Sequence, residues 1–500
     1  MKKPTLFLAL SLLLGIGARA ELQLPPLFSD NMVLQQGTSV PVWGWADDGE
    51  VVTVKFRGQT VSATTQNLKW SAKLRALKAG GPDTLTISTK TKTFTLKNVM
   101  VGEVWVCSGQ SNMEWPMTAA FEPQADIASA TNAMIRLFHV PKKKADGATV
   151  KINASWKVCA ADEVKSFSAV GYYFGRDLQA ARKVPLGLIE SDWGGSPAEV
   201  WMSREALEIN PRYQEEILEA YPAADKRYRE ALLAWEREKA DAEKAGQEFK
   251  KGGPWAPWKP TELYNGMIAP LIPYAIKGAI WYQGESNAGR AEQYRSLFAD
   301  MIRNWRRDWS NDDLTFLCVQ LAPFTAIKDQ PGESDWAELR EAQWLATKNL
   351  PQVGMAVITD VGDPKDIHPK QKQPVGARLA LAARGIAYKE KIEFSGPIYR
   401  RSEIKGDKMV LHFDHTGKGL EARDGELKGF AICGEDRKFV WTKAEIVRDT
   451  VVVSSSEVAK PVAVRYGWAN CPVVNLWNKD GLPASPFRTD DFPMITAGKK

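Results

Sequence analysis

The sequence predicts an α/β domain with a mostly parallel, three-layer sheet, flanked by two β-rich regions. Between about residues 99 and 388, apolar runs of strand length alternate with amphipathic segments of helical period, the pattern of a parallel sheet covered by helices. Residues 21–98 hold short β-like stretches separated by Gly and Asp turns, and similar stretches return over 389–493. We therefore expect sandwich-like β structure at both ends of the chain.

Each region has recognisable elements. In the N-terminal region the clearest strands are 39–45 and 51–56. The strands expected in the central sheet are 103–107, 185–189, 277–282, 315–321 and 353–359. A helix is expected after Ser168, a residue suited to the N-cap, because Val170, Phe174 and Leu178 recur at helical spacing.

One stretch interrupts the α/β pattern. Over 224–251, charged residues surround Tyr228, Leu232 and Trp235 at helical spacing, and a Gly-Gly-Pro sequence follows. We expect a solvated helical insertion, within about 204–262, that packs through a narrow apolar face. A partner-binding arm is the alternative.

The first 20 residues indicate export. They carry Lys2 and Lys3, an apolar stretch over 6–16, and the small-x-small sequence Ala18-Arg19-Ala20, which is typical of a secretory signal peptide. A membrane anchor is the alternative, but the stretch is shorter than the roughly 20 residues that span a bilayer. The mature protein is expected in the periplasm or outside the cell, without membrane insertion.

Charge and cysteine content bear on the possible partners and disulfides of the protein. Removing residues 1–20 takes away three positive charges and lowers the formal net charge from +6 to +3, so nothing favours a nucleic-acid partner. With five cysteines, at least one is expected to stay unpaired or to bond outside the chain. Cys107 and Cys318 lie in apolar runs, whereas Cys433 and Cys471 could pair. The oligomeric state stays open.

A serine follows the first strand of the central domain. Gly109-Gln110-Ser111-Asn112-Met113 comes directly after an apolar run that ends at 107. Strand-to-helix turns expose a side chain and offer free backbone amides, both of which a serine nucleophile needs. Ser111 is therefore the candidate nucleophile, provided that a base lies nearby.

Only one of the four histidines lies in a suitable loop. His139 lies in a strand-like run, and His412 and His415 lie where a strand meets a turn, without a third ligand that would indicate a metal. His368 follows the strand at 353–359 in a loop rich in Gly, Pro and Asp. Such loops often carry catalytic groups, and Asp366 or Asp363 could hold the imidazole.

Together these blocks resemble the sialate O-acetylesterase family of SGNH (GDSL-like) serine hydrolases. The blocks that carry the resemblance are 28–35, 104–116, 192–201, 263–271, 281–287, 366–369, 467–470 and 481–487. They span nearly the whole chain after residue 20. The resemblance implies a flavodoxin-like central domain and a serine esterase that needs no metal or organic cofactor.

The resemblance also implies a role for individual residues. Ser111 attacks an acetyl carbonyl, and His368 accepts its proton and returns it to the sugar oxygen. The backbone amides of Ser111 and Gly195 are the expected oxyanion donors. A side-chain amide joins them, from Gln283 or, as a substitute, from Asn287.

Two positions depart from the superfamily pattern. Lys365 stands three residues before the histidine, where an Asp is usual. Asp366 is therefore the expected orienting acid, Asp363 the runner-up, and a Ser-His dyad the third possibility. Glu285, in the third block, is interpreted as a hydrogen-bonding scaffold residue.

The expected substrate is a carbohydrate O-acetyl ester, most simply 9-O-acetylated sialic acid. Acetylated xylan is the closest alternative, and a non-catalytic carbohydrate-binding protein is an alternative of another class. Arg340 is a candidate partner for a sialate carboxylate, although a helix-surface ion pair is also expected for it. Three of the 19 tryptophans flank the site blocks and could stack on sugar rings: Trp115, Trp193 and Trp281.

Overall fold

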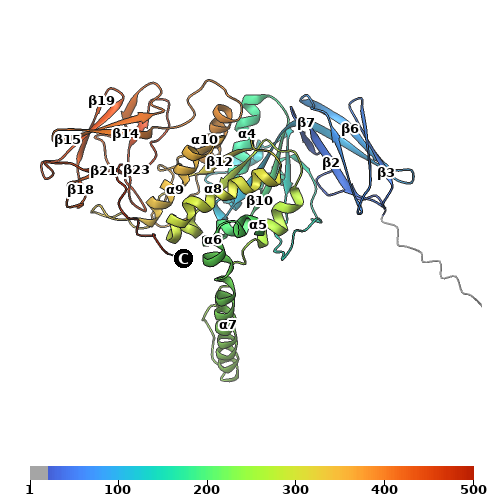
Figure 1. Ribbon diagram of the computed structural model, residues 1–500, viewed down its shortest axis with the longest axis horizontal. Helices are drawn as coiled ribbons and strands as arrows, with labels where there is room; N and C mark the ends of the chain where they lie inside the picture. The colour runs from blue at the N-terminus through green and yellow to red at the C-terminus, as the bar shows by residue number, and fades with distance from the viewer. Residues whose placement is uncertain (1–20, 500) are drawn as a thin grey trace, which may run out of the picture.

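The computed structural model describes residues 21–499, so the expected signal peptide lies outside the described residues. Figure 1 shows a central α/β part with a β region at each end, the N-terminal one in blue and the C-terminal one in orange and red. The mixed α/β architecture with extra β regions is confirmed. Within residues 21–499, no helix is long and apolar enough to cross a bilayer.

The central sheet is mostly parallel. Its strands are β7 (Thr93–Gly109), β8 (Asn132–His139), β9 (Lys157–Cys159), β10 (Leu186–Asp192), β11 (Gly278–Tyr282), β12 (Thr315–Val319) and β13 (Val353–Ala356). They lie in the order β13-β12-β11-β7-β10-β8-β9, and only β9 runs antiparallel to its neighbour.

The chain changes direction across the sheet at β7. β10 pairs with one edge of β7, while β11 and then β12 and β13 extend from the other edge. In open α/β sheets a crevice forms at such a point, outside the carboxyl ends of the strands. The residues that follow Gly109, Asp192 and Tyr282 therefore lie where ligands usually bind.

Alternate side chains of β7 enter two different cores, as expected for a strand buried on both faces. Val104 and Val106 belong to a cluster that includes residues of α8 (Ala291–Asp308) and α9 (Asp335–Asn349). Trp105 and Cys107 belong to a second cluster with α4 (Ala169–Arg182) and α10 (Gln373–Ile386). The expected cap of α4 is confirmed, since Ser168 Oγ accepts a hydrogen bond of 3.0 Å from the Gly171 amide.

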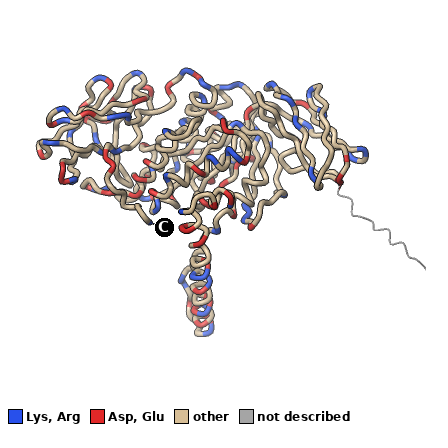
Figure 2. Tube along the Cα trace, viewed as in Figure 1, with Lys and Arg blue, Asp and Glu red and all other residues tan. Residues whose placement is uncertain are grey.

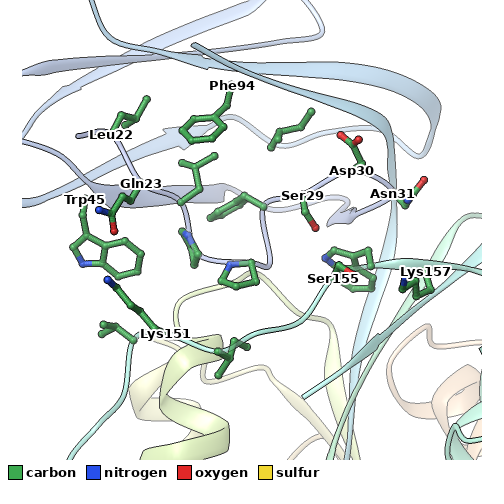
Figure 3. A pocket seen from close by; sticks show the side chains of 18 of the residues that line it. Leu22, Gln23, Ser29, Asp30, Asn31, Trp45, Phe94, Lys151, Ser155 and Lys157 are labelled. Carbon is green, nitrogen blue, oxygen red and sulfur yellow. The ribbon is translucent and has the colours of Figure 1, made fainter. Parts of the chain in front are cut away.

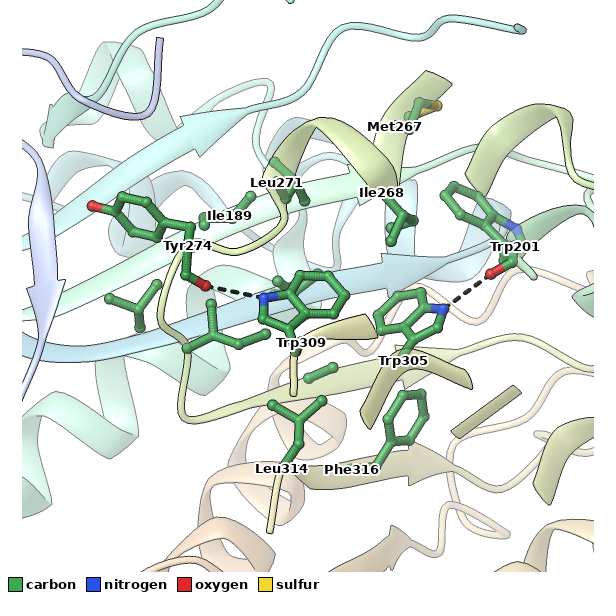
Figure 4. Close-up of a cluster of buried hydrophobic side chains, with 14 of the residues drawn as sticks. Ile189, Trp201, Met267, Ile268, Leu271, Tyr274, Trp305, Trp309, Leu314 and Phe316 are labelled. Atoms are coloured by element: carbon green, nitrogen blue, oxygen red, sulfur yellow. Dashed lines mark hydrogen bonds between the residues drawn. The ribbon is translucent and has the colours of Figure 1, made fainter. Parts of the chain in front are cut away.

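Tryptophans of α8 fill the first of these cores (Figure 4). The Trp305 indole donates to the Trp201 carbonyl at 2.9 Å, and the Trp309 indole donates to the Tyr274 carbonyl at 3.0 Å. Because the indole N–H groups of Trp305 and Trp309 each have a partner, these two rings are buried without an unsatisfied donor.

The N-terminal β region is continuous with the central sheet. Its strands are β1 (Val33–Gln35), β2 (Val40–Trp45), β3 (Val51–Phe56), β4 (Gln59–Thr64), β5 (Lys69–Leu74) and β6 (Gly80–Ser88). β2 pairs with β5, β3 pairs with β4 and β6, and both β6 and β1 pair with β7. The expected boundary at residue 98 thus falls inside β7, where Asn98 takes a left-handed φ of 55°.

A groove of about 800 Å³ runs between this region and residues 150–158. Figure 3 shows Trp45, Phe94 and Lys151 along it, with Ser29 and Asp30 at the other end. Phe94 lies near the start of β7, whereas Ser111 follows its end, so the groove is separate from the serine.

The C-terminal β region has its own core. Its strands are β14 (Ile398–Lys405), β15 (Lys408–Asp414), β16 (Leu420–Ala422), β17 (Phe430–Cys433), β18 (Val440–Trp441), β19 (Lys443–Val447), β20 (Thr450–Ser454), β21 (Ala463–Tyr466), β22 (Leu476–Asn478) and β23 (Phe487–Arg488). Two four-stranded antiparallel sheets, β14-β15-β20-β19 and β18-β17-β21-β23, contribute to a shared apolar cluster. The two β regions are therefore separate units.

The insertion is a protruding helix, and the narrow apolar face expected for it is present: Tyr228, Leu232 and Trp235 are half-buried, and Trp235 meets Phe249 with ring centroids 5.6 Å apart. After α5 (Arg204–Glu208) and α6 (Pro211–Tyr213), α7 (Tyr221–Lys244) points away from the body (Figure 1), and none of its residues is buried. Acidic and basic residues alternate along it (Figure 2). The chain that follows α7 folds back along this helix, and the Trp235 indole donates to the Lys251 carbonyl at 2.8 Å.

Short elements connect these parts. They are α1 (Ser111–Glu114), α2 (Gln124–Ala128), α3 (Ala161–Val164), the 3₁₀ turns Met117–Ala119, Ala198–Trp201, Ala269–Leu271 and Glu285–Arg290, and the π-helical turns Gln214–Leu218 and Tyr264–Ile268. All five cysteines are buried free thiols, so Cys433 and Cys471 do not pair.

Candidate active site

Ser111 begins α1 after a tight turn at the end of β7. Gly109 has a φ of 141°, and a Cβ at this position would come within 2.2 Å of the Tyr282 carbonyl oxygen. The Gln110 amide donates to that same oxygen at 3.0 Å. Only glycine tolerates this conformation and this close approach, and it is what brings Ser111 beside the end of β11.

The imidazole of His368 meets the serine hydroxyl. His368 Nε2 lies 2.8 Å from Ser111 Oγ, although 257 residues separate the two in sequence. The ring stacks on Trp115, with centroids 5.0 Å apart and an interplanar angle of 17°. Burial, together with the positive charge of Lys372, lowers the pKa of His368 below 6.5, despite the opposing effect of Asp366. The imidazole is therefore neutral near pH 7 and able to accept a proton.

Asp366 supports the histidine mainly through its backbone. Asp366 Oδ1 accepts a hydrogen bond of 2.9 Å from the His368 amide and lies 3.7 Å from His368 Nδ1, which is too long for a hydrogen bond to the ring. Asp363 instead accepts a bond of 2.8 Å from the Lys365 amide. The loop thus orders the histidine without a direct carboxylate-imidazole hydrogen bond.

The turn after β10 lies against the serine. The Gly194 amide donates to Glu114 Oε2 at 2.7 Å, and a Cβ at Gly194 would come 3.2 Å from the Ser111 Cβ. A Cβ at Gly195, which has a φ of 74°, would meet no atom within 4 Å. Gly195 therefore borders open space and directly follows the glycine that lies against Ser111.

The side-chain amide of Gln283, which was expected to face the serine, is hydrogen-bonded to other buried groups. Gln283 is fully buried, and its Nε2 donates to the Ser196 carbonyl at 3.2 Å and to Asn287 Oδ1 at 2.6 Å. Its Oε1 accepts from the Tyr294 hydroxyl at 3.0 Å. Since a primary amide has two hydrogens, Gln283 has none left for an oxyanion.

Asn287 is engaged in the same way. Its Oδ1 also accepts from the Ala198 amide at 2.9 Å, and its Nδ2 donates to Glu199 at 3.0 Å. Both amides thus brace residues 196–199, which follow Gly195. The expectation that Gln283 or Asn287 points at the serine is corrected, because buried polar groups must satisfy one another first.

Two residues that the sequence analysis did not single out link the site together. Asn112 donates to Glu285 Oε1 at 2.7 Å and to the Ile367 carbonyl at 3.0 Å, and it accepts from Lys372 Nζ at 2.6 Å. Burial raises the pKa of Glu285, which fits its expected scaffold role. Asn112 lay inside the serine motif, whereas nothing in the sequence pattern distinguished Lys372.

Arg340 takes neither of its two expected roles. It is fully buried in α9, and it donates to four backbone carbonyls, those of Leu321, Ala322, Ala469 and Asn470. Burial lowers the pKa of Arg340 to about 9. Since all its contacts are to backbone oxygens, it fastens the 467–470 block to the central domain.

The three flanking tryptophans have different surroundings. Trp115 stacks on His368, and Trp193 packs edge-to-face against Trp258 with centroids 5.6 Å apart. Trp281 is fully buried between Trp201 and Trp305. Stacking of a sugar on Trp281 is therefore excluded, because its ring belongs to the core.

A cavity of about 290 Å³ opens beside His368. Acidic side chains line it, namely Asp360, Asp363 and Asp366, together with Lys370 and the ring of Phe121, which is 55% exposed. Across residues 21–499, no three His, Cys, Asp or Glu side chains are grouped so that they could hold a metal ion.

Comparisons with known proteins identify carbohydrate esterases as relatives of this chain. A family profile described as carbohydrate esterase, sialic acid-specific acetylesterase, matches residues 244–384. The sialate O-acetylesterase of Mus musculus is 29% identical and covers 92% of this chain and 93% of its own; that of Homo sapiens is also 29% identical, covering 95% and 92%.

One solved structure has a higher sequence identity to this chain than these two relatives. The crystal structure of a carbohydrate acetylesterase from Xanthomonas citri is 39% identical, with a TM-score of 0.81, and the match covers 94% of this chain and 100% of that one. The match therefore includes the central domain and both β regions. The chain is an esterase and belongs to the sialate O-acetylesterase family of carbohydrate esterases.

Proposed function

We propose that this carbohydrate O-acetyl esterase is exported and that Ser111 and His368 carry its reaction. The observation that supports this most directly is the 2.8 Å contact between Ser111 Oγ and His368 Nε2 at the carboxyl ends of β7 and β13. A hydroxyl bonded to a neutral imidazole is the arrangement that activates a serine nucleophile.

The first half of the reaction forms an acetyl-enzyme. Ser111 Oγ bonds to the acetyl carbonyl carbon while its proton moves to His368 Nε2. The carbonyl oxygen becomes an oxyanion, and the amides of Ser111 and Gly195 donate to it. The bond to the sugar oxygen then breaks, and that oxygen takes the proton from His368. Each oxyanion donor contributes a factor of about 10² to 10³ in turnover.

The second half releases acetate. Water replaces the sugar, gives a proton to His368 and attacks the acetyl carbon. The bond to Ser111 Oγ breaks, and the proton returns to that oxygen. Asp366 orders the His368 backbone and stabilises the imidazolium through its charge across 3.7 Å.

The proposal extends to the fold and the location of the protein. The strand order β10-β7-β11-β12-β13 corresponds to the 2-1-3-4-5 order of doubly wound sheets, which supports a three-layer SGNH domain over 99–388 between β units at 21–98 and 389–493. Export rests on the character of residues 1–20.

The first substrate to test is 9-O-acetylated sialic acid, because the curated relatives are sialate O-acetylesterases. Acetylated xylan is the second, and one observation favours it. The leaving sugar must lie on the His368 side, where Asp363 and Asp366 outnumber Lys370 in the cavity and Asp360 is paired with Arg378; this negative excess disfavours the carboxylate of a sialic acid. Turnover of 9-O-acetylsialic acid and of acetylated xylo-oligosaccharide should be compared, and activity on xylan alone would refute the sialate assignment.

The catalytic assignment has its own test. Ser111→Ala should lower release of acetate from a chromogenic ester by about 10⁴-fold or more. An organophosphate should label Ser111 in the wild type, with the adduct located by mass spectrometry. Undiminished turnover in Ser111→Ala would place the nucleophile elsewhere and would favour a carbohydrate-binding role for this cleft.

A further inference from the structure

Lys372 is a buried ammonium group beside the proposed catalytic pair. Its side chain is 1% exposed at the start of α10, and its Nζ lies 5.6 Å from the ring centre of Trp115 and 5.3 Å from that of Tyr282. Its hydrogen bond of 2.6 Å goes to Asn112 Oδ1. Glu285 and Asp366 act on it only through longer-range electrostatics.

Lys372 is one of three partners that fix which way the Asn112 amide faces. An ammonium group only donates hydrogen bonds, so it must face the carbonyl oxygen of the amide. The Asn112 nitrogen then faces the other way and gives one hydrogen to Glu285 and one to the Ile367 carbonyl. The reversed amide would lose all three hydrogen bonds.

The network ties together the immediate neighbours of both reacting residues. Asn112 follows Ser111, and Ile367 precedes His368. The bond of 3.0 Å from Asn112 to the Ile367 carbonyl therefore joins the nucleophile's helix to the histidine loop. Lys372 lies at the end of the same loop. Its hydrogen bond to Asn112 is therefore a second link between the His368 loop and the helix that begins at Ser111.

We propose that Lys372 is a positioning residue for the esterase reaction. It orients Asn112 so that the His368 loop is held against Ser111, and its positive charge favours the neutral imidazole that the reaction needs. This rests on the proposed roles of Ser111 and His368.

A purely structural role would not explain a charge at this position. An ammonium without a directly bonded carboxylate is costly to bury, and an apolar side chain of similar length packs at least as well. Burial lowers the pKa of Lys372 from 10.5 to about 7. Because the unfolded chain keeps its proton up to 10.5, the lysine is least favourable to stability below about pH 7.

The charges around His368 decide the direction of the pH effect. Asp366 on its own loop raises the pKa of His368, while Lys372 and burial lower it. Glu285, which follows β11, reaches the ring only through Asn112, and Trp115 is uncharged. Replacing Lys372 by an uncharged residue therefore raises the pKa of His368.

The test compares Lys372→Met and Lys372→Gln with wild type on a small chromogenic acetate ester. For Lys372→Met, kcat should fall by about 10²-fold with little change in KM, since misplacement by about 1 Å has effects of this size. The acidic limb of kcat/KM should move to higher pH, and Tm at pH 6 should stay the same or rise. Lys372→Gln keeps a hydrogen-bond donor without the charge, so it should lose less kcat but show the same limb shift.

Lys365→Met is the matched control, because Lys365 is an exposed lysine of the same loop. This variant should keep the wild-type kcat and the wild-type position of the acidic limb of kcat/KM. An unmoved acidic limb in both Lys372 variants, or a fall in Tm parallel to the loss of kcat, would overturn the proposal. Failure of the catalytic assignment would appear differently, as undiminished turnover in Ser111→Ala.

Discussion

The segments that follow β13 and β11 both carry polar side chains to the same edge of the sheet, yet only the first places a side chain on the Ser111 hydroxyl. After β13, the His368 imidazole ends on the Ser111 hydroxyl, next to a cavity. After β11, Gln283 and Asn287 bond to each other and to residues 196–199. Residue type alone does not make a group available for chemistry. Availability depends on whether neighbouring buried groups have already used its hydrogen-bonding capacity.

The largest loss of activity should come from a substitution in the segment after β13. His368→Ala removes the hydrogen-bond partner of the Ser111 hydroxyl, so kcat/KM on an acetate ester should fall by about 10⁴-fold. Tm should change little, because His368 lies in a partly exposed loop. A variant that keeps more than a tenth of wild-type activity would mean that another base serves Ser111.

Gln283→Leu should show the opposite pattern. It removes the hydrogen bonds that Gln283 makes to the Ser196 carbonyl, to the Tyr294 hydroxyl and to Asn287, which keeps its other bonds, and each buried group left unsatisfied costs about 1–3 kcal/mol. Denaturant unfolding should therefore show a clear loss of stability, while the kcat of the folded fraction should stay above that of His368→Ala. If stability were unchanged and kcat fell by about 10³-fold, Gln283 would be an oxyanion donor after all.

The pH profile of the wild type sharpens the same comparison. Because burial and Lys372 hold the pKa of His368 below 6.5, kcat/KM should rise with pH through a value below 6.5 and then level off. Activity is lost as the pH falls, because the imidazole then becomes protonated and cannot accept the serine proton. A midpoint above 6.5 would show that Asp366 outweighs the other two influences.

The smallest effect is expected from Asp366→Asn. The carboxylate is 3.7 Å from the ring nitrogen and bonds to the His368 amide, and an asparagine oxygen can replace that bond. We expect a loss in kcat of less than about tenfold, since an exposed charge at this distance contributes roughly 1 kcal/mol or less. Asp363→Asn serves as the paired control, and a loss of 10³-fold or more in Asp366→Asn would make it a full member of a triad.

Several features were predictable from local sequence. The strands at 103–107, 277–282 and 315–321 are continuous apolar runs, and each became a buried parallel strand because such runs are stable only between two helical layers. Ser168 was recognisable as a cap from the spacing that follows it. Ser111 and His368 stood out because each follows a strand in a polar turn.

Other features had no local signal. The α7 pattern of Tyr228, Leu232 and Trp235 indicates a packing face, but it does not say what covers it; in the structure Trp235 packs on Phe249, in the chain that follows the same helix. Arg340 looked like a surface residue of a helix, although its guanidinium meets carbonyls from two distant segments. Lys372 lies in an ordinary polar loop sequence, and its burial depends on Trp115 and Tyr282, which come from other parts of the chain.

The sequence by itself determined the order of strands and helices, the glycine that permits the turn at 109, and the pairing of a serine block with a histidine block. These depend on side-chain period and on backbone freedom, which are local properties. Only the tertiary structure decided which buried polar groups satisfy one another. It directed Gln283 inward, left Gly195 beside open space and placed a lysine against Asn112, because hydrogen-bond partners distant in sequence compete for the same donors and acceptors once water is excluded.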